Sequence, residues 1–265
     1  ARDVVALLDE LGIDKPVKLC GHDWGGWTGF VTSMMFPERV DRYLALNIPP
    51  PWLDPSPFNL ARALKATSRL WYQVVMATPG LNWLAQAGPM RSVFDSRLIG
   101  SVDNKEAWAD GAIDTYLAQF DVPERRRSSK FIYRRFLLTE LPQIQIGKYL
   151  KGKLETPTLL LFGRNDIAID PDVIDADHSK YATDMTVEFV DDCGHFIVDE
   201  RPELVAVVRG LIFRAALASF TMRVNGLPSG RITASTNSRS AHTLFFDWGR
   251  RRAPGFSSGA SRING

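Results

Sequence analysis

The chain has 265 residues, of which 45% are hydrophobic and 23% are charged, a composition typical of a soluble globular enzyme. No apolar run is long enough to cross a membrane, so we expect no transmembrane helix. The net charge of +2 comes from the segment 218–265, which has seven arginines and one acidic residue, so we expect no nucleic-acid binding by the rest of the chain.

The two cysteines, Cys20 and Cys193, lie in apolar stretches and show no spacing typical of metal ligands. We expect both to be buried, reduced thiols in a cytoplasmic protein. The sequence therefore gives no reason to expect a bound metal ion.

The N-terminal part of the chain alternates between predicted helix and predicted strand. Residues 2–12 have the apolar spacing of an amphipathic helix, and 17–20 follow as a short strand. A second helix is predicted near 27–36, and Pro37 ends it. Residues 40–48 form the next predicted strand.

The segment 50–150 has a different character from the regions on either side. It is rich in aromatic side chains, it is helical in pattern, and proline and glycine interrupt it. We interpret it as a helical cap inserted between two strands. Its aromatic content favours a small, apolar organic substrate.

The alternating pattern returns after the cap. Strands are predicted at 156–162 and 186–190, and helices are predicted over roughly 171–181 and 198–217. Strands that alternate with helices are typical of a parallel sheet with helices on its faces. The predicted fold class is therefore α/β.

The predicted organisation places the two parts of one core at 1–49 and 151–217. The cap lies between them. The remaining segment, 218–265, is rich in serine, glycine and arginine and shows little periodicity, so we expect this basic tail to be disordered or non-native.

The string Gly21-His22-Asp23-Trp24-Gly25 lies where a predicted strand turns into a predicted helix. Such a turn forces its central residue into a strained conformation, and small residues two positions away avoid a clash. Asp23 would project at a helix N-terminus, where the helix dipole favours an anion. We predict Asp23 to be a nucleophile, whereas the alternative is a turn with an N-capping aspartate. We expect His22, its neighbour, to have a structural role.

Two further candidate residues follow later strands. Asp166 comes after the strand at 156–162, and His195 comes after the strand at 186–190. A nucleophile, an acid and a histidine in this chain order are typical of a hydrolase triad. Asp191 and Asp192 are alternatives for the acid, although they are too close to the histidine in sequence to orient it easily.

These strings resemble the epoxide hydrolase and haloalkane dehalogenase branch of the α/β-hydrolase family. The resemblance covers about residues 1–217, and its most specific part is the elbow around Asp23. It implies that Asp23 attacks carbon to form an ester and that His195, oriented by Asp166, activates water. The backbone N–H of Trp24 would stabilise the oxyanion. No metal or organic cofactor is implied.

The resemblance also extends to one string of the cap. Phe131-Ile132-Tyr133-Arg134 is similar to the cap motif that carries a proton-donating tyrosine in epoxide hydrolases. Tyr72 is a weaker match for a second such tyrosine, and Tyr116 is its rival. A haloalkane dehalogenase is the alternative enzyme, in which the Trp24 indole would bind the halide. A fragment that at most binds apolar ligands is the non-catalytic alternative.

Complete members of this family have several strands and a His-Gly-x-Pro loop before the first helix seen here, and neither is present in this sequence. We therefore expect a chain without its N-terminal strands and without a second oxyanion donor. Its sheet should have an exposed edge, and hydrolysis should be slower by roughly 10²–10³-fold.

Overall fold

A computed structural model describes residues 1–52, 71–92, 103, 106, 108, 109, 111–174 and 178–214, together with the backbone of 243–246. In this part of the chain, helices alternate with strands that pair in parallel. The predicted α/β fold class is therefore confirmed. No helix among these residues is both long enough and apolar enough to span a bilayer.

The sheet has the strand order β4-β3-β2-β1-β5, and every described pair of neighbours is parallel. Strands β1 to β4 lie side by side in chain order, as is common for consecutive strands of a sheet. All six residues of β3 are buried, as expected for a strand covered on both faces. The strands are β1 (Val17–His22), β2 (Val40–Leu46), β3 (Thr158–Gly163), β4 (Met185–Val190) and β5 (Thr243–Phe246).

The strand β5 corrects one expectation for part of the segment 218–265. Residues 243–246 belong to the segment expected to lack regular structure, yet they form a strand. This strand pairs in parallel with Lys18–Gly21 of β1, so the edge strands of the described sheet are β4 and β5. The other residues of the segment 218–265 lie outside the described part of the chain.

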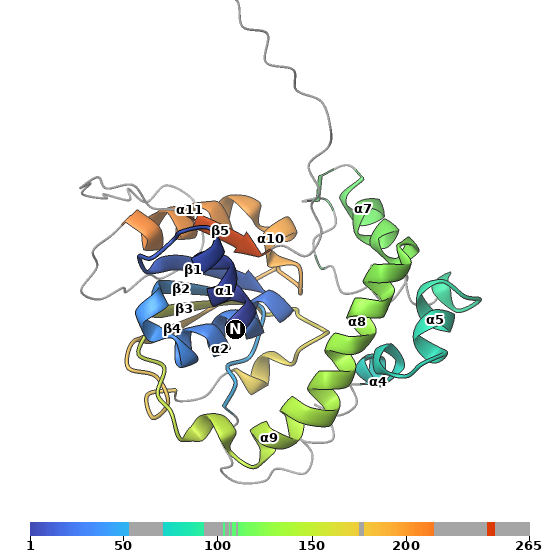
Figure 1. The fold of residues 1–265 in the computed structure, drawn as a ribbon. Coiled ribbons are helices and arrows are strands. Elements are labelled where there is room, and N and C mark those ends of the chain that lie inside the picture. The colour runs from blue at the N-terminus through green and yellow to red at the C-terminus, as the bar shows by residue number, and fades with distance from the viewer. Residues whose placement is uncertain are drawn as a thin grey trace, which may run out of the picture.

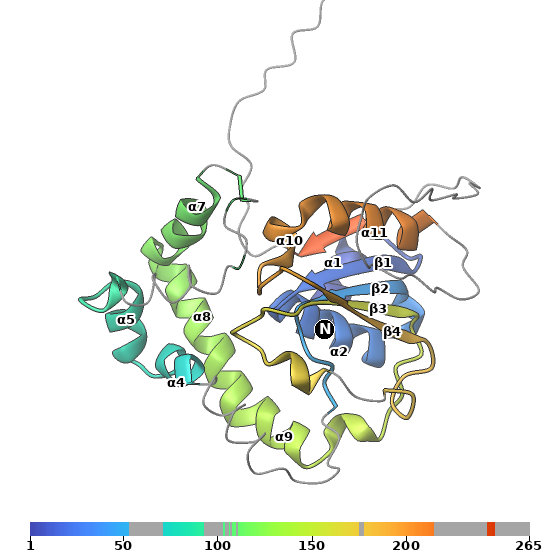
Figure 2. The same cartoon turned by 180° about the vertical axis from the view of Figure 1, so that it is seen from behind.

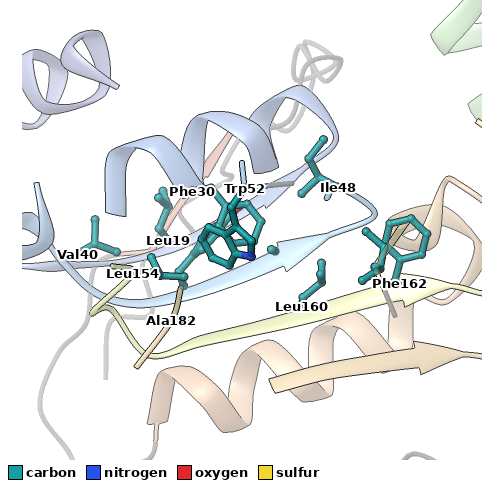
Figure 3. Close-up of a cluster of buried hydrophobic side chains, with 12 residues drawn as sticks. Leu19, Phe30, Val40, Ile48, Trp52, Leu154, Leu160, Phe162 and Ala182 are labelled. Carbon is teal, nitrogen blue, oxygen red and sulfur yellow. The ribbon is translucent and has the colours of Figure 1, made fainter. Parts of the chain in front are cut away.

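Helices cover both faces of the sheet (Figures 1 and 2). On one face, α2 packs against alternate strand residues such as Leu19, Tyr43 and Leu160, which form the cluster drawn in Figure 3. On the other face, α10 and α11 pack against the intervening residues, such as Leu44 and Leu161. The two-residue period of a strand therefore divides the core into two layers. The helices of this part are α1 (Arg2–Glu10), α2 (Trp24–Met35), α10 (Ile197–Glu200) and α11 (Pro202–Arg214).

The described elements between β2 and β3 are all helical, as predicted for the insertion. They gather beside the sheet, on the side toward which the arrow of β5 points (Figure 1), so the carboxyl ends of the parallel strands face the insertion. The longest, α8, continues into a π-helical turn at Phe136–Glu140. The helices are α4 (Trp71–Ala77), α5 (Leu81–Gln86), α7 (Ala112–Ala118), α8 (Pro123–Arg135) and α9 (Leu141–Gln145). Short 3₁₀ turns at Pro37–Arg39, Gln119–Asp121, Lys148–Leu150 and Pro171–Val173 complete the connections.

Three helix predictions differ from the structure. The helix expected near 27–36 begins at Trp24, because Gly25 and Gly26 continue the helix instead of forming a turn. The helix expected at 198–217 is divided at Arg201, since the residue before Pro202 disfavours helical backbone. Of the helix expected over 171–181, the described residues form only a 3₁₀ turn at Pro171–Val173.

Helix α2 lies so close to the sheet that one position requires glycine. A Cβ atom on Gly29 would lie 2.5 Å from the ring of Tyr43, which is fully buried on β2. The hydroxyl of Tyr43 donates a hydrogen bond to the carbonyl of Gly26, so the ring cannot easily move away. The absence of a side chain at Gly29 therefore sets the distance between α2 and the sheet.

We predict opposite effects for one substitution at two helical glycines. Gly29→Ala should lower the free energy of unfolding by about 1–3 kcal/mol, because the added methyl overpacks the core. Gly210→Ala, in α11, should raise it by about 0.5–1 kcal/mol, since nothing lies within 4 Å of the added Cβ. Urea denaturation of both variants measures the difference, and a Gly29→Ala protein as stable as the wild type would contradict the packing described here.

Candidate active site

The turn between β1 and α2 places Asp23 at the carboxyl end of the sheet. Its backbone has φ 50° and ψ −120°, a region that non-glycine residues rarely adopt. A Cβ atom on Gly21 would lie 2.4 Å from the carbonyl oxygen of Gly25, so backbone packs directly on backbone across the turn. The strained turn and its need for glycine agree with the conformation expected from the sequence.

His195 and Asp166 meet beside this turn. The Nδ1 atom of His195 donates a hydrogen bond of 2.8 Å to Oδ2 of Asp166, and Nε2 of the same ring lies 3.9 Å from Oδ1 of Asp23. The carboxylate of Asp166 is buried, and its Oδ1 accepts backbone hydrogen bonds from Ala168 and Ile169. The imidazole therefore has one nitrogen held by an acid and the other directed toward Asp23.

Asn47 is a residue of this site that sequence reasoning missed. It follows β2 with φ 44°, is completely buried, and donates hydrogen bonds of 2.8 Å to Asp166 and 3.1 Å to the carbonyl of Gly194. It thus links the loop of the acid to the loop of the histidine. A polar residue at the end of an apolar strand was the available signal, because the ends of parallel strands meet at one edge.

His22 has the structural position expected for it. Its Nε2 atom lies 2.8 Å from the backbone oxygen of His195, and the two rings are 5.2 Å apart. Burial and the neighbouring His195 lower the pKa of His22, so the neutral ring can donate this hydrogen bond. His22 therefore connects the elbow to the histidine loop.

The charges of the site are strongly coupled. Burial lowers the pKa of His195, but the charge and hydrogen bond of Asp166, with the charge of Asp23, outweigh burial and raise it to about 9. Burial raises the pKa of Asp166, but His195 and the hydrogen bond from Asn47 outweigh burial and lower it. At neutral pH the imidazole is therefore protonated between two carboxylates.

Aromatic side chains of the insertion lie over the elbow. The ring centroid of Trp24 lies 5.3 Å from that of Tyr133 and 5.1 Å from that of Phe136, both edge to face. The ring centroids of Tyr72 and Tyr133 are 5.9 Å apart. Burial raises the pKa of both tyrosines, and the charge of Asp23 raises it further. Both phenols therefore remain protonated O–H donors within the electrostatic reach of Asp23.

The other residues considered from the sequence lie elsewhere. The hydroxyl of Tyr116 donates a hydrogen bond of 2.8 Å to Asp199, and its ring packs against Trp108 and Phe196. Asp191 forms an exposed ion pair with Arg164, whereas the backbone oxygen of Asp192 accepts a hydrogen bond from an arginine. It is Asp166, and neither of these two aspartates, that the structure brings to Nδ1 of His195.

Both cysteines are buried and free, as expected. Burial raises the pKa of the Cys20 thiol to about 12, and burial also raises the pKa of Cys193, so neither has the character of a reactive thiolate. Among the residues that the structure describes, histidine, cysteine and acidic side chains form no group that could hold a metal ion.

The raised pKa of His195 makes a prediction about stability. The proton is bound more tightly in the folded state, with a pKa of about 9, than in the unfolded chain, where a histidine has its ordinary pKa of about 6.5. The resulting stabilisation is complete below the unfolded pKa and is lost as the pH rises through the folded pKa. Urea denaturation between about pH 6 and pH 9.5 should show a loss of unfolding free energy of roughly 3 kcal/mol at most. His195→Gln should abolish this part of the pH dependence. If the unfolding free energy of the two proteins changes equally with pH, the interaction of His195 with its neighbouring carboxylates is contradicted.

Comparisons with known proteins show what the chain is similar to. The sequence matches the profile of the alpha/beta hydrolase fold over residues 1–202. Among curated proteins it is 23% identical to human "Epoxide hydrolase 4" over 77% of this chain and 54% of that protein. It is 26% identical to "Haloalkane dehalogenase 2" of Mycobacterium bovis, over 78% and 67% of the two chains.

A solved structure is also similar. Cfl2 from Burkholderia cenocepacia superimposes with a TM-score of 0.64 and 25% sequence identity, over 80% of this chain and 69% of that chain. The chain spans about half the length of the first curated relatives that it matches.

Proposed function

Because the chain belongs to the α/β-hydrolase fold family, we propose that the protein containing it hydrolyses epoxides to diols through an ester of Asp23. One observation carries the proposal. The carboxylate of Asp23 lies 3.9 Å from Nε2 of His195, which Asp166 holds, and the neighbouring ring of Trp24 packs against Tyr133, which in turn contacts Tyr72. A nucleophile, a base for water and donors for a leaving oxygen are the groups that this reaction needs.

In the first step, a carboxylate oxygen of Asp23 attacks an epoxide carbon and the carbon–oxygen bond of the ring breaks. The oxygen that leaves takes the proton of a tyrosine hydroxyl, for which Tyr133 and Tyr72 are the candidates. Protonated His195 beside Asp23 stabilises the attacking carboxylate in the resting site. The product of this step is a hydroxyalkyl ester of Asp23.

Ester formation changes the charge that His195 experiences. The charge of Asp23 contributes to the raised pKa of His195, and esterification removes that charge. The pKa of the imidazole then falls, its proton is released and restores the tyrosine, and the neutral ring becomes a general base. Formation of the Asp23 ester therefore converts His195 into the base that the second step needs.

In the second step, His195 takes a proton from water and the resulting hydroxide attacks the ester carbonyl. The oxyanion is stabilised by the backbone N–H of Trp24, the first residue of α2, where helix amides have no intrahelical acceptor. When the ester carbon–oxygen bond breaks, the departing alkoxide takes the remaining proton of the attacking hydroxyl, which releases the diol and restores the carboxylate. The proton from water remains on His195, so the resting charges are regenerated.

The two tyrosines favour an epoxide over a haloalkane. A departing halide needs N–H donors and takes no proton, whereas an epoxide oxygen needs an acid. The aromatic surroundings of Trp24, Tyr133 and Phe136 suit a small apolar substrate.

The proposal predicts a trapped ester. In the full-length protein that contains this chain, His195→Gln should form the Asp23 ester with an aryl epoxide and fail to hydrolyse it. Intact-protein mass spectrometry should show a gain equal to the whole mass of the epoxide. The matched control, Asp23→Asn combined with His195→Gln, should show no gain.

Two other results would reject the proposal. If only a bromoalkane transfers its alkyl group to the His195→Gln protein, the activity is that of a haloalkane dehalogenase. If neither reagent gives a mass gain, Asp23 does not act as a nucleophile on these substrates.

A further inference from the structure

We propose that Glu200 is a positioning residue for His195, because its buried carboxylate holds the backbone on both sides of the histidine. The inference rests on the proposed function and deepens it, since it concerns the step in which His195 activates water. Glu200 lies at the end of α10, five residues after the histidine.

The carboxylate of Glu200 accepts hydrogen bonds from both neighbours of His195. Its Oε2 atom accepts from the backbone N–H of Gly194 at 2.9 Å, and its Oε1 atom accepts from that of Phe196 at 3.1 Å. The side chain is buried, with 1% of the residue exposed. Each of its two oxygens therefore fixes one amide beside the histidine, and together they set the direction of the ring.

The same carboxylate also holds a residue of the insertion. The backbone N–H of Asp103 donates a hydrogen bond of 3.0 Å to Oε2 of Glu200. The side chain of Asp103 accepts a hydrogen bond of 2.8 Å from Asn165, which precedes Asp166. Glu200 and Asp103 thus join the histidine loop, the acid loop and the insertion.

This arrangement requires a carboxylate and not an amide. Three backbone N–H donors converge on the two oxygens of Glu200. A glutamine has one oxygen and one NH₂ group, so at least one buried N–H would face another donor. An unpaired buried amide costs about 1–3 kcal/mol, and the loop would move to relieve it.

Glu200 acts on His195 through its negative charge as well as through its hydrogen bonds. After the larger effects of burial, Asp166 and Asp23, the charge of Glu200 also raises the pKa of His195. Replacing Glu200 by glutamine should therefore make the imidazole less basic. A residue that only supported the fold would not shift the pH profile of the step that uses His195.

The experiment measures ester formation and ester hydrolysis separately, by rapid quench and mass spectrometry with an aryl epoxide in the full-length protein. Glu200→Gln should slow ester hydrolysis by about ten- to a hundredfold, because a small displacement of the base has a large effect on rate. Ester formation should change by no more than about twofold. The midpoint of the pH profile for hydrolysis should move to lower pH.

Two further variants separate position from charge. Glu203→Gln removes the same charge from an exposed position on α11 and should leave both steps unchanged. Glu200→Asp keeps the charge but is one methylene shorter. It should slow ester hydrolysis while the midpoint of its pH profile stays near that of the wild type. If Glu200→Gln does not fold, Glu200→Asp alone tests whether Glu200 positions His195.

The outcomes are distinct. Hydrolysis at the wild-type rate in Glu200→Gln, or equal slowing of both steps with no change in the pH midpoint, would overturn the role of Glu200 alone. A wild-type protein that forms neither ester nor diol would overturn the proposed function and this inference with it.

Discussion

The reversal of the chain at Asp23 is the constraint on which the rest of the site depends. A positive φ at an aspartate is costly by itself, and it is maintained because β1 and α2 are both packed against the core. Gly21 allows the backbone to close on itself, and Gly29 allows α2 to lie directly on Tyr43. The position of the carboxylate therefore follows from backbone packing rather than from its own side-chain contacts.

The second determinant is the balance of charge around His195. Two buried or partly buried carboxylates and one imidazole share the site, and a protonated ring neutralises part of their charge. Asn47 and the backbone of Ala168 and Ile169 satisfy Asp166, which keeps this carboxylate ionised. In the proposed reaction, esterification of Asp23 upsets this balance and changes the imidazole from a cation into a base.

Much of the sheet and the candidate triad could be predicted from the sequence, because apolar strands and their polar ends are local patterns. Asp166 and His195 could be paired for that reason. Asn47 also ends an apolar strand, but its two partners could not be predicted, since they are more than a hundred residues away in the sequence. The break before Pro202 follows from a local rule, because the residue before proline disfavours helical backbone. The pairing of Thr243–Phe246 with β1 depends on a contact between distant segments that carries no local signal. The contacts of Tyr116 with Asp199 and Phe196 could not be predicted either, because they depend on tertiary packing.

The central claim is that Asp23, and not water, attacks the substrate. A single turnover in ¹⁸O-labelled water, with the full-length protein in excess over an aryl epoxide, tests it most directly. The account predicts that the diol of this first turnover contains the unlabelled oxygen of Asp23 and that the label enters the Asp23 carboxylate, where peptide mass spectrometry can locate it. A diol labelled in the first turnover, with an unlabelled Asp23, would mean that water attacks the substrate directly and would contradict the account.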